Sequence, residues 1–360
     1  MKSAESKRLD MLHGPIWSKL PQFALPVAAT AILEQLFNAS DIAVVGNFTG
    51  ADKTIAVAAV GANSALIALI VNLFIGIALG ANVVIANAVG RGDREAVQKA
   101  VHTSIVFSLL GGIVVAVLGE LAAAALLRTL HVPDDVFPQA LLYLRIYLMG
   151  MPVILLYNFE AAIFRSVGET RVPLVALAMS GVVNVLLNLF FVAVLHMTVN
   201  GVAIASVMAN AFSSALLFRR LLRSGKDIRL EPRRLRMDGR SLWMILRIGL
   251  PGAFALLVET SSFAVIALLV APLGTTVVAG HQVALNVSGL VFMVPLSLGA
   301  ATTIRVGSRL GEGNLAGARA ARLTALFLAL ILVAIVGSVI SLPIFRAGAY
   351  RDLLDVQDGD

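Results

Sequence analysis

The stretch LRIGLPGAFALLVETSSFAVIALLVAP, residues 246–272, decides the fold, because it carries a single carboxylate, Glu259, inside a long apolar run. A helix of this length can cross the roughly 30 Å hydrocarbon layer of a membrane. A charge at the centre of such a helix costs on the order of 3 kcal/mol or more. The stretch therefore predicts a transmembrane helix in which Glu259 has a function.

The same pattern occurs 225 residues earlier in the chain. Pro26 precedes Glu34 by eight residues, just as Pro251 precedes Glu259. The turns after the second helix of each copy also match: VGRGDREAVQKA at 89–100 and LGEGNLAGARAA at 310–321. About six helices fit within one period, so the copies run in the same direction, as in transporters with two lobes related by an axis along the membrane normal.

The composition is that of a polytopic membrane protein. The chain of 360 residues is 59% hydrophobic and only 14% charged, and its mean hydropathy is +0.91. Both fractions lie outside the range of soluble domains. The absence of cysteine excludes disulfides and thiolate metal sites.

Nine apolar spans are expected in an all-α bundle, at about 21–45, 55–81, 103–127, 141–164, 173–195, 202–222, 242–270, 277–304 and 323–344. We divide the chain into a cytoplasmic segment (1–20), a first lobe of six helices (21–223), a basic cytoplasmic linker (224–241), a partial second lobe of three helices (242–345) and a polar tail (346–360). By the repeat offset, residue 360 corresponds to about residue 135, so the last three helices of the second copy are expected to be missing.

The distribution of positive charge orients the predicted helices. Of the 28 lysines and arginines, 23 fall in the segments on one side of the membrane and 5 on the other. Basic loops stay in the cytoplasm, which predicts a cytoplasmic N-terminus. The basic run at 219–240 is interpreted as a solvated linker that sets topology, with a lipid headgroup contact as the alternative. This pattern disfavours nucleic acid as a partner.

No catalytic constellation is visible. The Gly-x-Gly turns lack a following Gly-Lys-Ser/Thr, so helix termination explains them better than phosphate binding. Four of the five histidines lie near the ends of expected spans, and His281 stands alone beside Gln282 without a second ligand at metal spacing. We therefore expect no enzyme activity and no cofactor.

Polar residues recur on single faces of the expected helices. Asp41 follows Glu34 by seven residues, nearly two helical turns, and Asn184 and Asn188 are four residues apart. In the second copy, Glu259 is joined by a further pair four residues apart, Gln282 and Asn286. Such groups normally face a bundle interior or a water-filled cavity.

These residues are the candidate site. For the amide side chains, hydrogen bonding between helices is the simpler alternative. A buried carboxylate is more informative, because its charge needs a proton or a metal cation. We therefore expect Asp41, Glu259 and Glu34 to take part in cation coupling, with Na⁺ at Glu259 or Asp41 as the only metal. The cavity residues expected beside them are Asn184, Asn188, Gln282 and Asn286.

Several motifs resemble the multidrug and toxic compound extrusion (MATE) transporters. The segments LEQLFNASDIAVVGNFTGADKTIAVAAVGANS (33–64), GANVVIANAVGRGDREAV (80–97) and FRSVGETRVPLVALAMSGVVNVLLNLFFV (164–192) resemble the N-lobe of that family. The segment at 257–314, which begins LVETSSFAVIALLVAP, resembles the start of the C-lobe in the NorM-like branch. The resemblance extends over essentially the whole chain.

The resemblance implies twelve helices in two six-helix lobes, and export of cationic or amphiphilic compounds in exchange for Na⁺ or H⁺. By position, Asp41 matches the acidic residue of the first helix and Glu259 the seventh-helix glutamate linked to cation binding. Asn184 matches the fifth-helix asparagine, whereas Asn188 stands where many relatives have a second aspartate. The tenth helix of the family, which often supplies a further aspartate, would lie beyond residue 360.

Two other functions stay open at this point. The chain could be a truncated, non-transporting fragment of such a transporter, or a lipid-linked oligosaccharide flippase of the same superfamily. A flippase would need arginines in its cavity, and within the expected spans Arg145 is nearly alone. As a transporter, the chain is expected to be a monomer of the bacterial inner membrane that handles small molecules, with the substrate and coupling ion undetermined.

Overall fold

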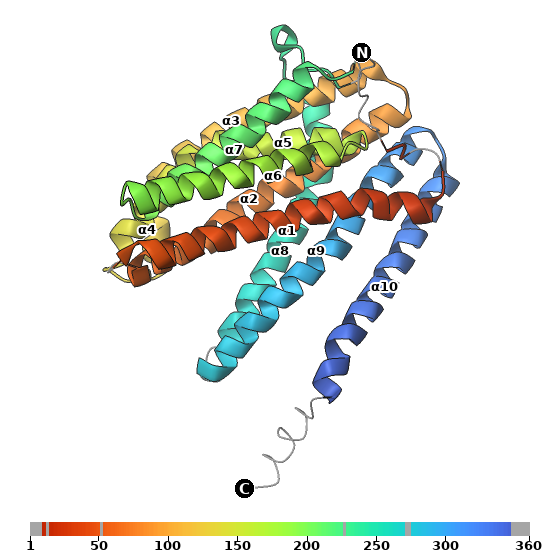
Figure 1. Ribbon diagram of the computed structural model, residues 1–360. Helices are drawn as coiled ribbons and strands as arrows, with labels where there is room; N and C mark the ends of the chain where they lie inside the picture. Colours follow the sequence, from red (N-terminus) through yellow and green to blue (C-terminus); the bar gives the residue numbers. More distant parts are fainter. Residues whose placement is uncertain (1–8, 12–13, 51–52, 226–227, 271–274, 347–360) are drawn as a thin grey trace, which may run out of the picture.

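The chain folds into long helices connected by short turns (Figure 1). The computed structural model describes residues 9–11, 14–50, 53–225, 228–270 and 275–346, and no strand occurs among them. The helices are α1 (Ile16–Phe48), α2 (Lys53–Gly90), α3 (Arg94–Thr129), α4 (Phe137–Met149), α5 (Met151–Ser166), α6 (Arg171–Asn188), the π-helix η2 (Leu189–Val194), α7 (Val199–Leu222), the 3₁₀ turn η3 (Pro232–Arg234), α8 (Gly239–Val270), α9 (Thr275–Gly311) and α10 (Leu315–Arg346).

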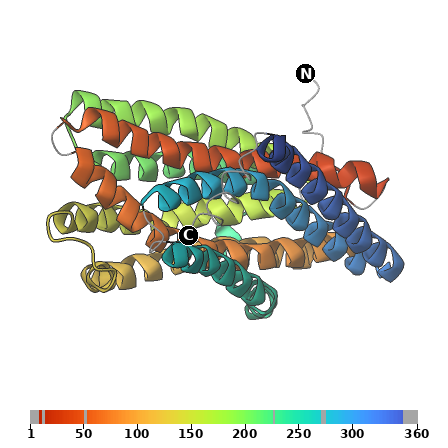
Figure 2. The same ribbon diagram turned by 90° about the horizontal axis from the view of Figure 1, so that it is seen from below.

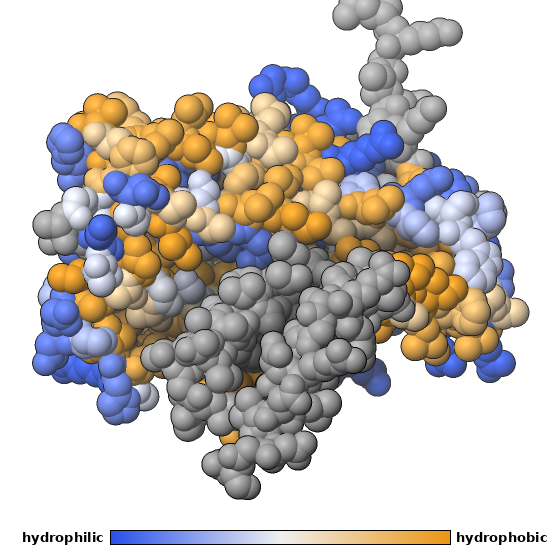
Figure 3. All heavy atoms as spheres, turned by 60° about the horizontal axis from the view of Figure 1, so that its bottom comes forward, coloured by the Kyte–Doolittle hydropathy of each residue, from blue (hydrophilic) through white to orange (hydrophobic). Residues whose placement is uncertain are grey.

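The helices have the length and surface of membrane spans. In the described part of the chain, seven helices are long and apolar enough to cross a bilayer, and the bent pair α4–α5 would make eight. Large apolar side chains point outward, such as Leu121, which is 79% exposed. Figure 3 shows apolar residues over much of the face that it presents. A surface of this kind indicates a membrane rather than water as the solvent. The prediction of a polytopic all-α protein is confirmed.

The expected span at 141–164 is two helices rather than one. Helices α4 and α5 meet at Gly150 with a bend of 51°. Pro152 lies in the first turn of α5 and has no N–H for the carbonyl four residues earlier, which interrupts the hydrogen-bond pattern. The bend thus falls beside Pro152. Pro26, Pro251 and Pro295 lie inside continuous helices.

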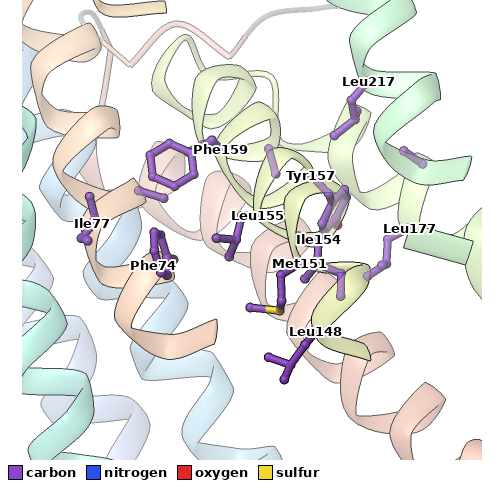
Figure 4. Packing of buried hydrophobic residues seen from close by; sticks show 14 of the residues in the cluster. Phe74, Ile77, Leu148, Met151, Ile154, Leu155, Tyr157, Phe159, Leu177 and Leu217 are labelled. Carbon is purple, nitrogen blue, oxygen red and sulfur yellow. The ribbon is translucent and has the colours of Figure 1, made fainter. Parts of the chain in front are cut away.

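Helices α1–α7 share one hydrophobic core centred on α5. Phe159, Leu155 and Met151 are at most 1% exposed, and Figure 4 shows them between helices of the first lobe. The Phe107 ring packs between the rings of Phe159 and Phe74, at centroid distances of 5.7 and 6.3 Å. This core holds α5 rigidly beside α2, α3 and α7.

The basic linker is less solvated than we expected. Ile228 and Leu230 are at most 1% exposed, because apolar side chains in the linker pack into the core of the first lobe. The backbone N–H of Glu231 donates to Nε2 of His102 at 3.2 Å. The N–H of Asp238 donates to Oγ1 of Thr103 at 3.0 Å. The described basic side chains of the linker, such as Arg229, Arg233 and Arg236, are exposed as predicted, but its apolar side chains and these two backbone contacts attach the linker to the first lobe.

The start of α8 is capped by Asp238, the residue directly before the helix begins. The Asp238 carboxylate accepts hydrogen bonds from the hydroxyl and the backbone N–H of Ser241, at 2.7 and 2.8 Å. These are the contacts of a helix N-cap. They lower the pKa of Asp238, the side-chain hydrogen bond contributing most. The cap fixes where the chain enters the second lobe.

The residues before α1 contact both halves of the chain. The N–H of Leu9 donates to the carbonyl of Gly168, after α5. The guanidinium of Arg305, on α9, donates through Nη2 to the carbonyl of Gly14 at 2.9 Å. These bonds place the N-terminal segment beside the loops that carry most of the positive charge.

The second lobe packs on the first through α2. Helix α8 lies along α2 and α3, and α9 lies along α1 and α2 (Figures 1 and 2). Glycines on α2 permit the contact: a Cβ at Gly76 would overlap the backbone of Ala253, and one at Gly80 would overlap the carbonyl of Ile245. The Asn87 amide donates to the carbonyl of Gly307 at 3.1 Å. Small residues allow helices to approach closely in membranes.

Replacing Gly80 by alanine is expected to destabilise the contact between the lobes. The added methyl group would collide with backbone atoms of α8, which cannot move as a side chain can, and overpacking of this kind costs about 1–3 kcal/mol. Thermal denaturation in detergent measures the effect. Gly61→Ala, in the same helix but with open space around it, is the control and should unfold at the same or a higher temperature. Equal denaturation curves for the two variants would contradict the close contact.

Candidate functional site

Three polar side chains from two helices surround one carboxylate in the first lobe. Oδ2 of Asp41, on α1, accepts a hydrogen bond from the Ser206 hydroxyl of α7 at 2.9 Å. Oδ1 of Asp41 accepts from the Asn188 amide of α6 at 2.6 Å. The Asn188 amide also donates to Oδ1 of Asn184 at 3.2 Å, and the Asn184 amide donates to Oγ of Ser206 at 3.4 Å. We call these residues the Asp41 cluster.

The helical repeat explains why these residues meet. Asn184 and Asn188 are four residues apart and therefore occupy one face of α6. This face packs against both α1 and α7 (Figure 1). All four side chains of the Asp41 cluster are at most 7% exposed. The π-helix η2 begins directly after Asn188, and π-turns often mark functional sites in helices. The polar face predicted from spacing alone is thus the face that meets Asp41.

The Asp41 cluster has the chemistry of a small cation site. It gathers five oxygens, from one carboxylate, two amides and one hydroxyl. One of them, Oδ1 of Asn188, is buried without a hydrogen-bond partner in the described part of the chain. A carboxylate among neutral dipoles in a medium of low dielectric constant favours a proton or a metal cation beside it. Hard cations prefer oxygen ligands of these types.

Two tyrosines connect Asp41 to a second carboxylate of α1. Tyr143 and Tyr147, stacked at a centroid distance of 6.2 Å, both lie within electrostatic range of Asp41. Tyr147 also lies within range of Glu34, which in turn interacts with Arg165. The structure therefore brings Glu34 to the edge of the Asp41 region but not into its hydrogen-bond network.

The candidate residues of the second lobe are less enclosed. Glu259, on α8, is half-buried. Its neighbour Thr260 accepts a hydrogen bond from the Asn72 amide of α2 at 3.2 Å, which places this turn of α8 against the first lobe. Gln282 and Asn286 fall in the part of α9 whose side chains lie outside the described residues. The grouping of these two residues with Glu259 stays a prediction.

Sequence reasoning missed three polar residues. Ser206 belongs to the Asp41 cluster, but a lone serine in an apolar helix gives no signal in the sequence. Glu160, on α5, is fully buried, and Glu120, on α3, lies 3.4 Å from the Arg145 guanidinium. Both glutamates are carboxylates inside apolar spans, the same signal that identified Asp41. That signal was available and was not applied to them.

Comparison with known proteins agrees with the geometry. The profile of the family described as MatE matches residues 26–190 and 251–350. The chain belongs to the MatE family. The two matched segments cover the helices of the Asp41 cluster except α7, and the second begins in α8. The family resemblance predicted from the sequence is confirmed.

Relatives of this MatE chain include the multidrug resistance protein MdtK of Klebsiella pneumoniae strain 342. The two are 34% identical over 304 residues, which make up 82% of this chain and 65% of the relative. MdtK of a second strain of that species, MGH 78578, gives the same figures. The chain thus spans slightly less than two thirds of the length of the curated relatives that it matches.

Solved structures of MATE proteins share the fold of this MatE chain. A MATE crystal structure in the bent conformation superposes with a TM-score of 0.85 over 96% of this chain and 77% of the other, at 24% identity. An outward-facing multidrug resistance MATE transporter gives 0.83 over 96% and 76%, at 23% identity. A transporter of the same superfamily from Pyrococcus furiosus gives 0.83 over 93% and 74%, at 24% identity. The two-lobe MATE architecture is therefore the fold of this chain.

Proposed function

We propose that the chain exports cationic or amphiphilic small molecules across the bacterial inner membrane in exchange for Na⁺ or H⁺. The observation that carries the proposal is the buried Asp41 carboxylate, which accepts hydrogen bonds from an amide of α6 and a hydroxyl of α7. A buried charge without a cationic partner costs several kcal/mol. A mobile cation that binds there would offset that cost. Its movement across the membrane would then be coupled to the conformation of the protein.

Two further observations support transport. The curated relatives are multidrug resistance proteins, and the family is one of transporters rather than enzymes. In addition, close contacts of glycines with the backbone of the other lobe involve the C-terminal part of α2, the N-terminal part of α8 and the C-terminal part of α9. These parts adjoin the loops rich in lysine and arginine. Alternating access would require the lobes to separate on this side, which we expect to be the cytoplasmic one.

Cation binding would drive this movement only through a difference in affinity between the two arrangements of the lobes. Asp41 is on α1 and contacts α6 and α7. Helix α1 also packs against α9 of the second lobe. Neutralising Asp41 therefore changes the interactions of α1, a helix that contacts both lobes. This arrangement links ion binding to the contact between the lobes without a direct contact between the ion and the drug.

The direct test is accumulation of a cationic fluorescent dye, such as ethidium, in cells lacking their own exporters. We expect lower accumulation in cells that express the chain, and loss of that effect when the sodium gradient or the proton gradient is collapsed. The gradient that matters identifies the ion. Dye accumulation equal to that of cells with an empty vector would favour the non-transporting alternative.

Glu259→Gln is expected to abolish ion-coupled export while membrane expression is unchanged. Glu259 is half-buried, so a neutral amide of the same shape should not lower stability. Glu95→Gln is the matched control, because Glu95 is an exposed residue paired with Lys99 at 2.7 Å, and such surface pairs contribute at most about 1 kcal/mol. Undiminished export by Glu259→Gln would remove the second-lobe cation site from the proposal.

A further inference from the structure

A second carboxylate is enclosed more completely than Asp41. Glu160 is 0% exposed, and its Oε2 accepts one hydrogen bond, from the Ser214 hydroxyl of α7 at 2.9 Å. Its Oε1 is buried without a hydrogen-bond partner in the described residues. The hydroxyl of Tyr157, one turn earlier on α5 and 3% exposed, is also buried without a partner there. An ionised carboxylate with a single donor is strongly disfavoured in such a place.

The surroundings of Glu160 fit a proton better than a metal ion. Of the helices packed against α5, α7 supplies the Ser214 hydroxyl, and no described residue of α2, α3, α4 or α6 gives Glu160 a charged partner. Glu34 of α1 and Arg165 of α5 interact with Tyr157. Hard cations such as Mg²⁺ and Ca²⁺ take about six or more oxygen ligands, and this site offers far fewer. A single proton bound to Oε1 would instead convert the carboxylate into a neutral carboxylic acid.

Helix α7 connects Glu160 to the Asp41 cluster. Ser206 donates to Asp41, and Ser214 donates to Glu160. The two serines are eight residues apart, or about 12 Å along the helix axis. Asn210 lies midway, four residues from each, and its amide donates to the carbonyl of Ser206 at 2.9 Å. The polar side chains of Ser206, Asn210 and Ser214 therefore lie along one side of α7, between the two buried carboxylates.

From this arrangement we propose that Glu160 is a second proton-binding site of the first lobe, linked to Asp41 along α7. The inference rests on the proposed function, since it gives the coupling cation a second binding site. A proton from water forms an O–H bond on one oxygen of the Glu160 carboxylate, and the other oxygen keeps the Ser214 hydrogen bond. Release of the proton to water restores the carboxylate. The site lies near the end of α5, two turns before the loop at Gly168, and therefore serves exchange with the side of the basic loops.

Infrared difference spectroscopy of the purified full chain at neutral pH tests whether Glu160 holds a proton. Glu160→Gln should remove one carboxylic acid C=O band from the wild-type spectrum. Glu120→Gln is the control and should leave this band in place, because Glu120 pairs with the Arg145 guanidinium at 3.4 Å and lies outside the Glu160 site. Ser214→Ala leaves the acid in place but removes its hydrogen bond, so the same band should shift in frequency. A wild-type spectrum unchanged by Glu160→Gln, or a band unmoved by Ser214→Ala, would overturn the proposal.

Dye export separates failure of this inference from failure of the proposed function. A positioned proton-transfer group typically contributes about 10²–10⁴ in rate, so Glu160→Gln should slow proton-driven export at least roughly tenfold. If Asp41→Asn blocks export and Glu160→Gln does not, the inference is wrong and the proposed function stands. If neither substitution changes export, the coupling role proposed for Asp41 fails as well. If the wild-type chain exports nothing, the infrared experiment still decides whether Glu160 binds a proton.

Discussion

Replacing Asp41 by asparagine is expected to abolish ion-coupled export. The substitution removes the only charge of the Asp41 cluster and keeps its shape, so Ser206 can still donate to the remaining oxygen. Truncating one partner of a buried, hydrogen-bonded charge pair costs about 2–5 kcal/mol. A loss of about 3 kcal/mol weakens cation binding by roughly a hundredfold. The measurement is dye export driven by an imposed sodium or proton gradient in proteoliposomes.

Stability separates a defect in cation binding from a defect in folding. Asp41→Asn replaces a buried carboxylate by a neutral amide, so its denaturation temperature in detergent should equal or exceed that of the wild type. Glu120→Gln is the control, since its carboxylate pairs with the half-exposed Arg145 and lies outside the Asp41 cluster. We expect export by that variant within a few-fold of the wild type. Full export by a well-folded Asp41→Asn protein would refute a coupling role for Asp41.

The sequence predicted the parts of the site that depend on helical spacing. Asp41 was identified because a carboxylate in an apolar span is costly, and Asn184 and Asn188 because residues four apart share a face. These rules say which face of a helix is polar, and here that face meets its expected partner. They do not say which other helix lies opposite. Ser206 could not be predicted for this reason, since its role comes from the packing of α7 against α1 and α6.

Other features of the fold depend on close backbone contacts that sequence patterns do not encode. The contact of α2 with α8 relies on Gly76 and Gly80 meeting backbone atoms, but glycine is common throughout this chain and its spacing alone predicts no partner. The burial of Ile228 and Leu230 was missed because the many basic residues around them suggested a solvated linker. Pro152 explains the break at Gly150, since it lacks an N–H, but Pro26, Pro251 and Pro295 lie inside continuous helices, so proline alone does not predict where a helix breaks.

Asn188→Leu is expected to destabilise the protein more than most single substitutions. The Asn188 amide is a donor to Oδ1 of Asp41 at 2.6 Å, a distance typical of hydrogen bonds to charged groups. Leucine is similar in size but donates nothing, so the carboxylate would stay buried with one donor fewer. Losing a hydrogen bond to a charged group costs about 1.5–3 kcal/mol. The measurement is the free energy of unfolding, or the denaturation temperature, in detergent.

A double-mutant cycle with Asp41→Asn assigns that cost to the charge. In the Asp41→Asn background no charge remains to be satisfied, so Asn188→Leu should cost only about 1 kcal/mol, the usual net value of a neutral hydrogen bond. Asn158→Leu is the matched control, because the Asn158 amide donates only to the carbonyl of Ile154 in its own helix. Its cost should be about 1 kcal/mol in either background. Equal costs of Asn188→Leu with and without the Asp41 charge would mean that Asn188 serves packing of α6 rather than the carboxylate, and the Asp41 cluster would then be a structural contact instead of a cation site.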